Sequence, residues 1–485
     1  MEDMQIPVQA KPGTKRIERD SLGEREVPEE AYYGIETLRA QENFPISGMR
    51  PHPRFIWATA IVKRAAAEAN MAVGQLDQRV GGAIVRAAQE VIEGRWRDQF
   101  VVDVFQAGAG TSHNMNANEV LANRAIEALG GRKGDYRVVH PHDHVNMAQS
   151  TNDVFPTAMR LATLSLLEEL YGSLGKLASA LAAKAVEFRR VVKSGRTHLQ
   201  DAVPVTLGQE FRAYAGSIRR GTEKIREAAR SLLVLSIGAT AAGTGLNAHP
   251  LYRASVIERL RALTGFELEP AADPMEATQS IADFAHVSSA LKTLALDLIR
   301  IANDLRLMSS GPRTGIGEIN LPPVQPGSSM MPGKVNPVIA EVTDMVCFQV
   351  IGNDLAIAMA TQGGQFQLNV MMPVISLNLL QSTEILKNVV QVLADRCVSG
   401  ITANVEHCRE LAEESLGMAT ALNPHVGYDM ASRIAQEAQA TGRTIREIVL
   451  DKQLLSKEDL ERILDPSKMA IPVDAGEPGI DSRPK

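Results

Sequence analysis

Four polar stretches interrupt a chain that otherwise reads as long helices, and their side chains could together hold an anion. They are GAGTSHNMNANE around Thr111, QSTND ending at Asp153, SGRTHLQD around His198, and PGSSMMPGKVNP at 326–337. Each offers small hydroxyl or amide side chains, and glycines in three of them let backbone N–H groups approach a ligand closely. We expect Lys334 and His198 to be the side chains that bring positive charge to the ligand. This supply of donors suits a carboxylate better than a polyphosphate, which usually requires a P-loop or more Arg and Lys.

Taken one at a time, these stretches are weak evidence for a site. Ser, Thr, Asn and Gly are the ordinary residues of turns and helix caps. A plain linker between helices would account for Ser328 and Ser329, and a solvated side chain would account for Lys334. Their combination in one chain is what favours an anion-binding site.

The composition indicates a folded cytoplasmic protein that acts on small molecules. The 485 residues are 45% hydrophobic, and the net charge of −6 provides no basic field for nucleic acid or an anionic membrane. Cys347, Cys397 and Cys408 lack metal-ligand spacing and suit buried free thiols in a reducing compartment. The N-terminal MEDMQIPVQAKPG lacks the features of a signal peptide. We find no apolar run near the ~20 residues of a membrane span.

Long apolar seams predict an all-α fold with a rod-like bundle of helices. From Phe284 to Met308, apolar residues alternate spacings of three and four, as in coiled coils. Two further seams are Leu167, Leu170, Leu174, Leu177, Leu181 and Phe188, and Ile375, Leu379, Leu386, Val389 and Leu393, with a polar Ser382. A fourth, weaker seam has Phe211, Tyr214, Ile218, Ile225 and Leu232. Such a bundle leaves apolar stripes that another subunit could cover. The alternative is a monomeric all-α scaffold.

Three domains are the natural division of the chain. Residues 1–150 mix short helices with Gly- and Pro-rich turns, residues 151–405 hold the long seams, and residues 406–485 are a smaller charged helical piece. The tail from Val473 has too little apolar content to pack, so we expect it to be mobile.

Two other motifs suggest different chemistry. Gly243, Gly245 and Ala248 have the GxGxxA spacing of a dinucleotide-binding turn, which would make the protein an oxidoreductase. The chain shows no alternation of strands and helices to build the rest of that fold, so a glycine-rich turn between helices is the alternative. HPHDH, from His140 to His144, places histidines at alternate positions, as a strand-like metal site would. An ordinary set of structural histidines is the alternative there.

The stretch GSSMMPGKVNP resembles the signature GSSxMPxKxNP of the aspartase/fumarase superfamily and matches every fixed position. RIERDSLGEREVPEEAYYGIETLRAQENF, GAGTSHNMNANEVLANRA, HVNMAQSTND, GRTHLQDAVPVTLGQEF, GATAAGTGLNAHP and TALNPHVGYD also look like family segments, in the family's order. The resemblance implies a three-domain all-α fold with a central bundle of long helices. It also implies a homotetramer whose active sites take loops from three subunits. We expect no cofactor and no metal site, since no ligand set for a divalent cation is readable in the sequence.

Within the superfamily the closer resemblance is to the aspartate ammonia-lyases, carbon–nitrogen lyases that interconvert L-aspartate with fumarate and ammonia. AYYGIETLRAQENF, GAGTSHN and QSTND are similar to that group, whereas fumarases carry versions nearer to GSGTQSN and QSSND. GIGEI at 315–319 is nearer to fumarase, and Gln367 and Met372 stand where aspartate ammonia-lyases typically have glutamates. A fumarase that hydrates fumarate to malate is therefore the near alternative. A helical assembly protein without activity is the distant one.

The chemistry implied by the resemblance explains the residue types. Eliminating ammonia removes a weakly acidic C3 proton beside a carboxylate, which becomes a doubly charged enediolate. Preorganised neutral donors stabilise such charge with little reorganisation. By resemblance the site residues have these roles: Ser328 is the general base; Thr111, Ser150, Thr151 and Ser329 surround the β-carboxylate; Thr197, Lys334 and Asn336 hold the α-carboxylate; Asn152 and His198 lie near the amino group.

Two further expectations concern the loop and the HPHDH segment. Pro326, Gly327 and Gly333 would let the loop close over the substrate as a lid that carries its own base. Fumarases have a second dicarboxylate site in a segment close to HPNDHVN. Here His142 replaces the asparagine, so that site is doubtful.

Overall fold

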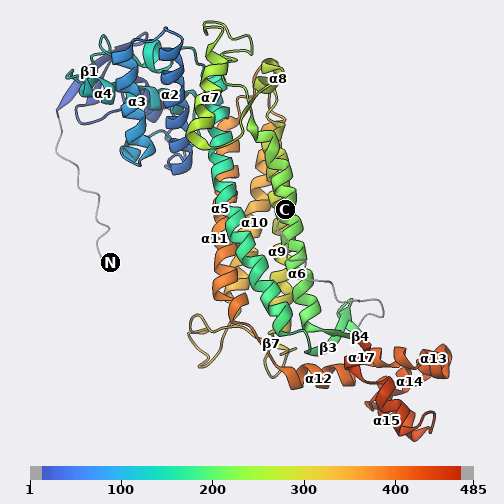
Figure 1. Ribbon diagram of the computed structural model, residues 1–485. Coiled ribbons are helices and arrows are strands. Elements are labelled where there is room, and N and C mark those ends of the chain that lie inside the picture. Colours follow the sequence, from blue (N-terminus) through green and yellow to red (C-terminus); the bar gives the residue numbers. More distant parts are fainter. Residues whose placement is uncertain (1–13, 471–485) are drawn as a thin grey trace. The chain divides into compact units, whose positions relative to one another are not determined.

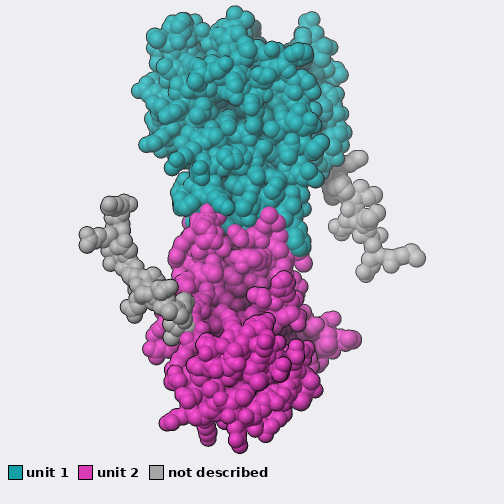
Figure 2. Space-filling view, turned by 90° about the vertical axis from the view of Figure 1, so that its right-hand side faces the viewer, with its two compact units in different colours: residues 1–171, 223–295, 348–386 teal, residues 172–222, 296–347, 387–485 magenta. Residues whose placement is uncertain are grey.

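The computed structural model describes residues 14–470, and the chain is mainly helical, as predicted (Figure 1). The expectations for MEDMQIPVQAKPG and for the tail from Val473 concern residues outside this range. Contacts divide the described chain into two compact units (Figure 2). Unit 1 comprises residues 14–171, 223–295 and 348–386, and unit 2 comprises residues 172–222, 296–347 and 387–470. The division into three domains at 1–150, 151–405 and 406–485 stays a prediction.

The α-helices have the following bounds: α1 (Ile35–Asn43), α2 (Pro53–Ala72), α3 (Gln78–Ile92), α4 (Thr111–Ala128), α5 (Thr151–Glu187), α6 (Leu207–Ala229), α7 (Tyr252–Thr264), α8 (Pro274–Gln279), α9 (Ala282–Met308), α10 (Val338–Thr361), α11 (Met372–Arg396), α12 (Val405–Glu414), α13 (Asn423–Val426), α14 (Tyr428–Thr441), α15 (Ile445–Asp451), α16 (Lys457–Ile463) and α17 (Pro466–Met469). Short helical turns are η1 (Arg97–Gln99), η2 (Gly108–Gly110), η3 (Pro141–Val145), η4 (Arg230–Leu233), η5 (Val398–Gly400) and η6 (Leu416–Leu422).

The strands form four two-stranded sheets. Their bounds are β1 (Lys15–Asp20), β2 (Gly23–Pro28), β3 (Val192–Thr197), β4 (Gln200–Thr206), β5 (Val234–Leu235), β6 (Glu269–Pro270), β7 (Ile319–Asn320) and β8 (Thr402–Ala403). Pairs β1–β2, β3–β4 and β7–β8 are antiparallel, and β5–β6 is parallel. Neither unit therefore contains, in its described residues, the parallel sheet that a dinucleotide-binding turn needs. Gly243 is instead a packing glycine, because its φ is +93° and an added Cβ would overlap the backbone of Met275.

The four predicted seams are the buried faces of α5, α6, α9 and α11. Every apolar seam residue is at most 5% exposed, including Phe188 and Leu232 just beyond the ends of their helices. The polar seam position is also explained, because Ser382 Oγ on α11 accepts a hydrogen bond of 3.0 Å from Asn353 Nδ2 on α10. A polar group buried with its partner costs little, so the seam tolerates it.

The N-terminal helices are longer than predicted. Helices α2, α3 and α4 have 20, 15 and 18 residues, and they share one apolar core rich in alanine. The Gly- and Pro-rich turns around them suggested short helices, but side-chain caps let α2 and α3 begin abruptly after a turn. Asp77, for example, accepts the backbone N–H groups of Arg79 and Val80 at the start of α3. The three cysteines are buried free thiols, as predicted, and burial raises the pKa of each to about 12.

Helix α10 is long and mainly apolar, although it contains Glu341, Asp344 and Asp354. Among the described residues it is the one helix long and apolar enough to cross a membrane by length and composition, with a mean hydropathy of 1.3. A core helix passes the same test, and α10 packs as one on part of its surface. Asp354 lies 2.5 Å from Lys292 Nζ and accepts a 2.7 Å hydrogen bond from Ser288 Oγ, both on α9.

The other side of α10 exposes an apolar stripe. It consists of Val342, Met345, Phe348, Leu355 and Met359, which are 37 to 65% exposed. This stripe matches the prediction that the bundle leaves apolar surface for another subunit, and the described residues of one chain leave it uncovered.

The two ends of α4 offer a test of how tightly its start is packed. Gly110 and Gly130 flank the helix with φ of +86° and +83°, but an added Cβ would overlap the Phe155 ring at Gly110 and would meet nothing within 4 Å at Gly130. We expect Gly130→Ala to cost about 1 to 2 kcal/mol of unfolding free energy through backbone strain alone. Gly110→Ala should cost at least about 2 kcal/mol more because it also overpacks the core. Denaturant unfolding of both variants measures the difference, and equal losses would contradict the packing described here.

Candidate active site

A polar pocket of about 580 Å³ in unit 1 contains three of the predicted site residues. Thr111, Ser150 and Thr151 lie in its wall, together with Thr240 and Asn247 from the segment before α7. The pocket thus brings together two of the four polar stretches, GAGTSHN and QSTND, with part of GATAAGTGLN. We call it the polar pocket below.

Two of the polar stretches are helix N-termini and not loops. Thr111 is the first residue of α4 and Thr151 is the first residue of α5, with Ser150 directly before it. The glycines and small polar residues that suggested loops are the capping segments of these helices. The first turn of a helix has unpaired N–H groups and the positive end of the helix dipole, so both helices favour an anion in the polar pocket.

Asn152 and Asp153 attach the segment 238–241 to the start of α5. Asn152 does not line the polar pocket, and its Nδ2 donates a 2.7 Å hydrogen bond to the carbonyl of Ala241. Asp153 is fully buried and accepts from the backbone N–H groups of Ser150 (3.0 Å), Gly238 (3.0 Å) and Thr240 (2.9 Å). Burial raises the pKa of Asp153 to about 7, although these donors and Lys63 lower it. Asp153 therefore sets the position of one pocket wall against another.

Backbone strain concentrates in the wall of the polar pocket. Ala148, Thr240 and Asn247 all line it, and their φ angles are +58°, +56° and +69°. Side-chain-bearing residues seldom adopt this region, and each such residue costs on the order of 1 kcal/mol or more. Strain of this kind persists where the surrounding structure determines it, which is typical of functional sites. No feature of the sequence marked Ala148 or Thr240.

A buried lysine beneath the polar pocket also escaped prediction from the sequence. Lys63 on α2 has no exposed surface, and its Nζ donates to Asn146 Oδ1 (2.9 Å) and Gln149 Oε1 (3.0 Å). Burial lowers the pKa of Lys63 to about 7, and the charge of Asp153 opposes that change. The available signal was a single lysine in the Ala-rich apolar run IVKRAAAEAN.

The HPHDH segment is a helical turn, η3, and not a strand-like metal site. His140 Nδ1 accepts the backbone N–H groups of His142 and Asp143, and the backbone N–H of His140 donates to His144 Nδ1 at 2.8 Å. His142 Nε2 lies 2.6 Å from Glu36 Oε1 at the edge of the polar pocket. Across residues 14–470, no group of three or more His, Cys, Asp or Glu side chains is placed to hold a metal ion.

The third polar stretch is a β-hairpin in unit 2. Thr197 ends β3, and His198 and Leu199 form the two-residue turn before β4. Both turn residues have positive φ, +57° and +59°, which such turns usually assign to Asn or Gly. This strained turn exposes Thr197 and His198 to solvent.

The fourth stretch, at 326–337, is an irregular loop in unit 2, as predicted. Ser328 Oγ accepts the backbone N–H groups of Met330 (3.1 Å) and Met331 (2.9 Å), so it already faces the donors that an alkoxide would need. Asn336 Nδ2 donates to the carbonyl of Gly327, and the N–H of Gly327 donates to the carbonyl of Lys334 at 2.9 Å. A Cβ at Gly327 would overlap that carbonyl, so the loop needs glycine there. Ser329 and Lys334 are exposed.

A buried ionic cluster ties the base of this loop to the hairpin. Glu318 is fully buried just before the loop, with Arg196 Nη1 2.8 Å from its Oε1 and Lys193 Nζ 3.1 Å from its Oε2. Lys193 also lies 3.0 Å from Glu210 on α6. Glu318 belongs to the fumarase-like GIGEI, so in this chain that motif positions the hairpin residue Thr197 and the loop together.

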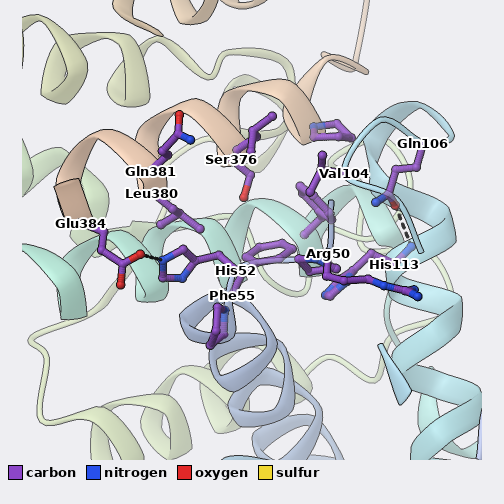
Figure 3. Close-up of a pocket in the computed structure, with 15 residues that line it drawn as sticks. Arg50, His52, Phe55, Val104, Gln106, His113, Ser376, Leu380, Gln381 and Glu384 are labelled. Atoms are coloured by element: carbon purple, nitrogen blue, oxygen red, sulfur yellow. Dashed lines mark hydrogen bonds and ion pairs between the residues drawn. The ribbon is translucent and has the colours of Figure 1, made fainter. Parts of the chain in front are cut away.

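Unit 1 contains a second pocket, of about 370 Å³, that holds none of the predicted site residues (Figure 3). Its walls are mainly apolar, from Phe55, Val104 and Leu380, and His52 Nε2 lies 3.0 Å from Glu384 Oε2 across one side. A mainly apolar wall gives a dicarboxylate few donors, so the polar pocket is the better candidate.

The structure thus divides the predicted site residues between the units. Thr111, Ser150, Thr151 and Asn152 lie in unit 1, and Thr197, His198, Ser328, Ser329, Lys334 and Asn336 lie in unit 2. Of the two departures from the aspartate ammonia-lyase pattern, Gln367 is exposed and Met372 is buried at the start of α11. Neither lines the polar pocket.

The ionic cluster predicts a large loss of stability when Glu318 loses its charge. Glu318→Gln leaves buried Lys193 with only Glu210, and Arg196 without its partner, so we expect a loss of about 3 kcal/mol or more in unfolding free energy. Glu210→Gln is the matched control, since Lys193 keeps Glu318 and should lose less. Chemical denaturation measures both, and similar small losses would show that the cluster does not hold the loop in place.

The contact between His142 and Glu36 predicts a pH-dependent contribution to stability. The hydrogen bond to Glu36 raises the pKa of the half-exposed His142 above its usual 6.5. The contribution is therefore fully present below about pH 6.5 and disappears as the pH rises through the raised pKa. Because the pair is half-exposed, solvent reduces it to about 0.5 kcal/mol. Glu36→Gln should lower the melting temperature at about pH 5.5 but not at about pH 9. In a His142→Asn background that pH difference should vanish, and a loss independent of pH would refute the assignment.

Comparison with known proteins places the chain in a family. The sequence matches the Lyase family over residues 23–352 and the Fumarase C C-terminus family over residues 418–470. An aspartate ammonia-lyase from Bacillus sp is 54% identical over 95% of this chain and 98% of its own length. An aspartate ammonia-lyase from Helicobacter pylori is 49% identical over 94% of this chain and 98% of its own length.

Solved structures agree with these sequences. A fumarate lyase:delta crystallin from Brucella melitensis, bound to cobalt, superposes with a TM-score of 0.92 at 51% identity, covering 95% of this chain and all of that chain. A class II fumarase from Schistosoma mansoni superposes with a TM-score of 0.91 at 36% identity and the same coverage. The chain therefore belongs to the lyase family that contains the aspartate ammonia-lyases.

Proposed function

We propose that the protein is an aspartate ammonia-lyase, a carbon–nitrogen lyase that reversibly removes ammonia from L-aspartate to give fumarate. Its sequence agrees over nearly the whole chain with enzymes of that name, at 49 to 54% identity. The structural observation that carries the chemistry is Ser328 Oγ, held by two backbone N–H groups inside the signature loop.

Ser328 is the general base in this proposal. A serine hydroxyl is a poor base unless its conjugate alkoxide is stabilised, and the N–H groups of Met330 and Met331 point at the oxygen that would carry the charge. The Ser328 alkoxide accepts the C3 proton of aspartate and becomes the neutral hydroxyl, which leaves the β-carboxylate as an enediolate. Ammonia then leaves from the opposite face, which gives an anti-elimination. Closure of the loop would exclude water and strengthen each of these interactions.

The β-carboxylate binds in the polar pocket, at the N-termini of α4 and α5. Thr111, Ser150 and Thr151 would donate to it, and Ser329 would join them from the signature loop. Support comes from Ser150, whose Oγ accepts the backbone N–H of Asn152 and so keeps its own proton for a ligand. Each preorganised donor to a developing oxyanion contributes on the order of 3 kcal/mol.

The remaining groups hold the other end of the substrate. Thr197, Lys334 and Asn336 would bind the α-carboxylate, and Asn152 and His198 would lie near the amino group. Lys334 and Thr197 are exposed within one chain, which suits groups that meet a ligand. One of the two Nδ2 protons of Asn336 holds Gly327, which leaves the other for the carboxylate.

The active enzyme is a homotetramer whose active sites combine loops from three subunits. The exposed apolar stripe on α10 supports assembly through the long helices, because a chain alone would leave it in water. The substrate partners are L-aspartate, fumarate and ammonia, with no nucleic acid and no membrane. We keep the cytoplasm as the predicted location, which the buried free thiols suit.

A fumarase is the second candidate. The superposition with the Schistosoma mansoni class II fumarase and the buried Glu318 of GIGEI favour it. The same loop, base and carboxylate pocket would then add water to fumarate.

Ultraviolet absorbance of fumarate separates the two candidates. Purified protein is given L-aspartate in one cuvette and L-malate in another. We expect fumarate from L-aspartate alone, which would make Gln367 and Met372 tolerated differences. Fumarate from L-malate alone would make the enzyme a fumarase and overturn the proposal.

Replacing the base tests the assigned mechanism. Ser328→Ala should lower kcat by about 1,000-fold or more while the oligomer and the melting temperature stay as in the wild type, because it removes the proton acceptor. Ser329→Ala is the control one residue along and should lose about 100-fold in kcat/KM as one oxyanion donor. Substantial turnover by Ser328→Ala would refute the assignment of the base.

A further inference from the structure

A chain of hydrogen bonds runs from the buried Lys63 to Thr151 through Asn146 and Asn114, which line the polar pocket. Asn146 is its fixed member, because its Nδ2 donates to the backbone carbonyl of Gln149 at 3.3 Å and a carbonyl can only accept. Its Oδ1 therefore faces the other way and accepts a 2.9 Å hydrogen bond from Lys63 Nζ. Lys63 Nζ also donates to Gln149 Oε1 at 3.0 Å.

The orientation of Asn146 determines the orientation of Asn114. Asn146 Oδ1 also lies 3.2 Å from Asn114 Nδ2 and 3.2 Å from Asn118 Nδ2, both on α4. An oxygen can face only donors at that distance, so both amides must present their NH₂ groups. Asn114 is 2% exposed and Asn118 is fully buried, so water cannot substitute for these contacts.

Asn114 in turn determines what the Thr151 hydroxyl can do. Asn114 Nδ2 lies 3.1 Å from Thr151 Oγ1, and since it can only donate, Oγ1 must accept. Thr157, further along α5, donates its hydroxyl proton to the carbonyl of Asp153, four residues back, at 2.7 Å. Thr151 is the first residue of α5 and has no such bond among the described residues. Its proton remains available to the polar pocket that it lines.

We propose that Asn114 is a positioning residue, which holds Thr151 as an acceptor so that the threonine hydroxyl donates its proton to a substrate carboxylate. This inference rests on the proposed function for the identity of the ligand. Lys63 and Asn146 act behind Asn114 by fixing its orientation. The Thr151 hydroxyl thereby becomes a hydrogen-bond donor with a fixed orientation, and no charged side chain is needed at this position in the pocket wall.

The test reverses the orientation of the bond and reads the affinity for succinate, an unreactive dicarboxylate, by calorimetry. Asn114→Asp replaces the donor with an acceptor, so Thr151 turns its proton toward residue 114 and away from the ligand. A new charge also repels the dicarboxylate, so the variant is compared in two backgrounds. Thr151→Ser keeps a hydroxyl, whereas Thr151→Val keeps the shape of threonine and has none.

We expect Asn114→Asp to weaken succinate binding about tenfold more in the hydroxyl-bearing backgrounds than in Thr151→Val, the effect of one hydrogen bond to a charged group. Repulsion by the added charge is the same in each background and cancels. Asn118→Asp is the matched control, since it faces Asn146 from the same helix without touching Thr151, and its penalty should not depend on residue 151. An equal penalty for Asn114→Asp in all backgrounds would overturn the proposal, because it would show that Asn114 acts through packing or charge.

If Asn114→Asp melts well below the wild type, Asn114→Leu is measured in the same backgrounds. Leucine is neutral and close in volume to asparagine, and we expect a loss of succinate affinity of about threefold with Thr or Ser at 151 and none with Val.

Measurements on the wild type separate this inference from the proposed function. Wild-type protein that binds succinate but does not act on L-aspartate refutes the proposed reaction and still permits the test, whereas wild-type protein that does not bind succinate refutes the inference.

Discussion

The candidate site depends on one constraint: two helices begin at the same pocket. Helix α4 starts at Thr111 and α5 at Thr151, and both first residues line the polar pocket of unit 1. Helix N-termini provide donors and positive potential without side-chain charge, which suits a substrate that must gain negative charge during the reaction. Gly110 permits the close approach of α4 to Phe155, and Asp153 fastens the segment 238–241 to α5.

The costs of this arrangement are visible around the pocket. Three side-chain-bearing residues in its wall have left-handed backbone conformations, and Lys63 and Asp153 are titratable groups without exposed surface. Each would destabilise an isolated helix pair, and the long buried seams of the bundle offset them. In unit 2 the hairpin at His198 and the ionic cluster around Glu318 show the same combination of strain and buried charge. The strained and buried groups hold the hydrogen-bond donors of the site rigidly in place.

The sequence predicted the bundle well because the apolar spacing of a helix is local and strict. All four seams are buried, and even Ser382 has its polar partner across the seam. The prediction of local structure failed where contacts with neighbouring residues outweighed the composition of a segment. GAGTSHN and QSTND have the residues of loops but form helix starts, since the same residues cap helices. His198 and Leu199 form a hairpin turn that normally calls for Asn-Gly, and HPHDH folds into a turn because His140 caps it.

The site was predicted in part, and the reason is physical. Thr111, Ser150 and Thr151 were identified through a resemblance, and the pocket brings them together. Asn114, Asn146 and Lys63 were not, because a buried polar residue has no mark in the sequence beyond its type. Their importance arises from which end of each amide faces which neighbour, and that information exists only in three dimensions. An exposed apolar stripe was predicted, but its location on α10 was not, since a helix that is apolar on most sides shows no clear period.

The most direct test of the account is a crystal structure of Ser328→Ala with L-aspartate bound. The account predicts one carboxylate in the polar pocket, with an oxygen within about 3 Å of the hydroxyl oxygens of Thr111, Ser150 and Thr151. L-Aspartate bound elsewhere, for example in the apolar pocket beside His52, with those three hydroxyls left without a ligand, would contradict it.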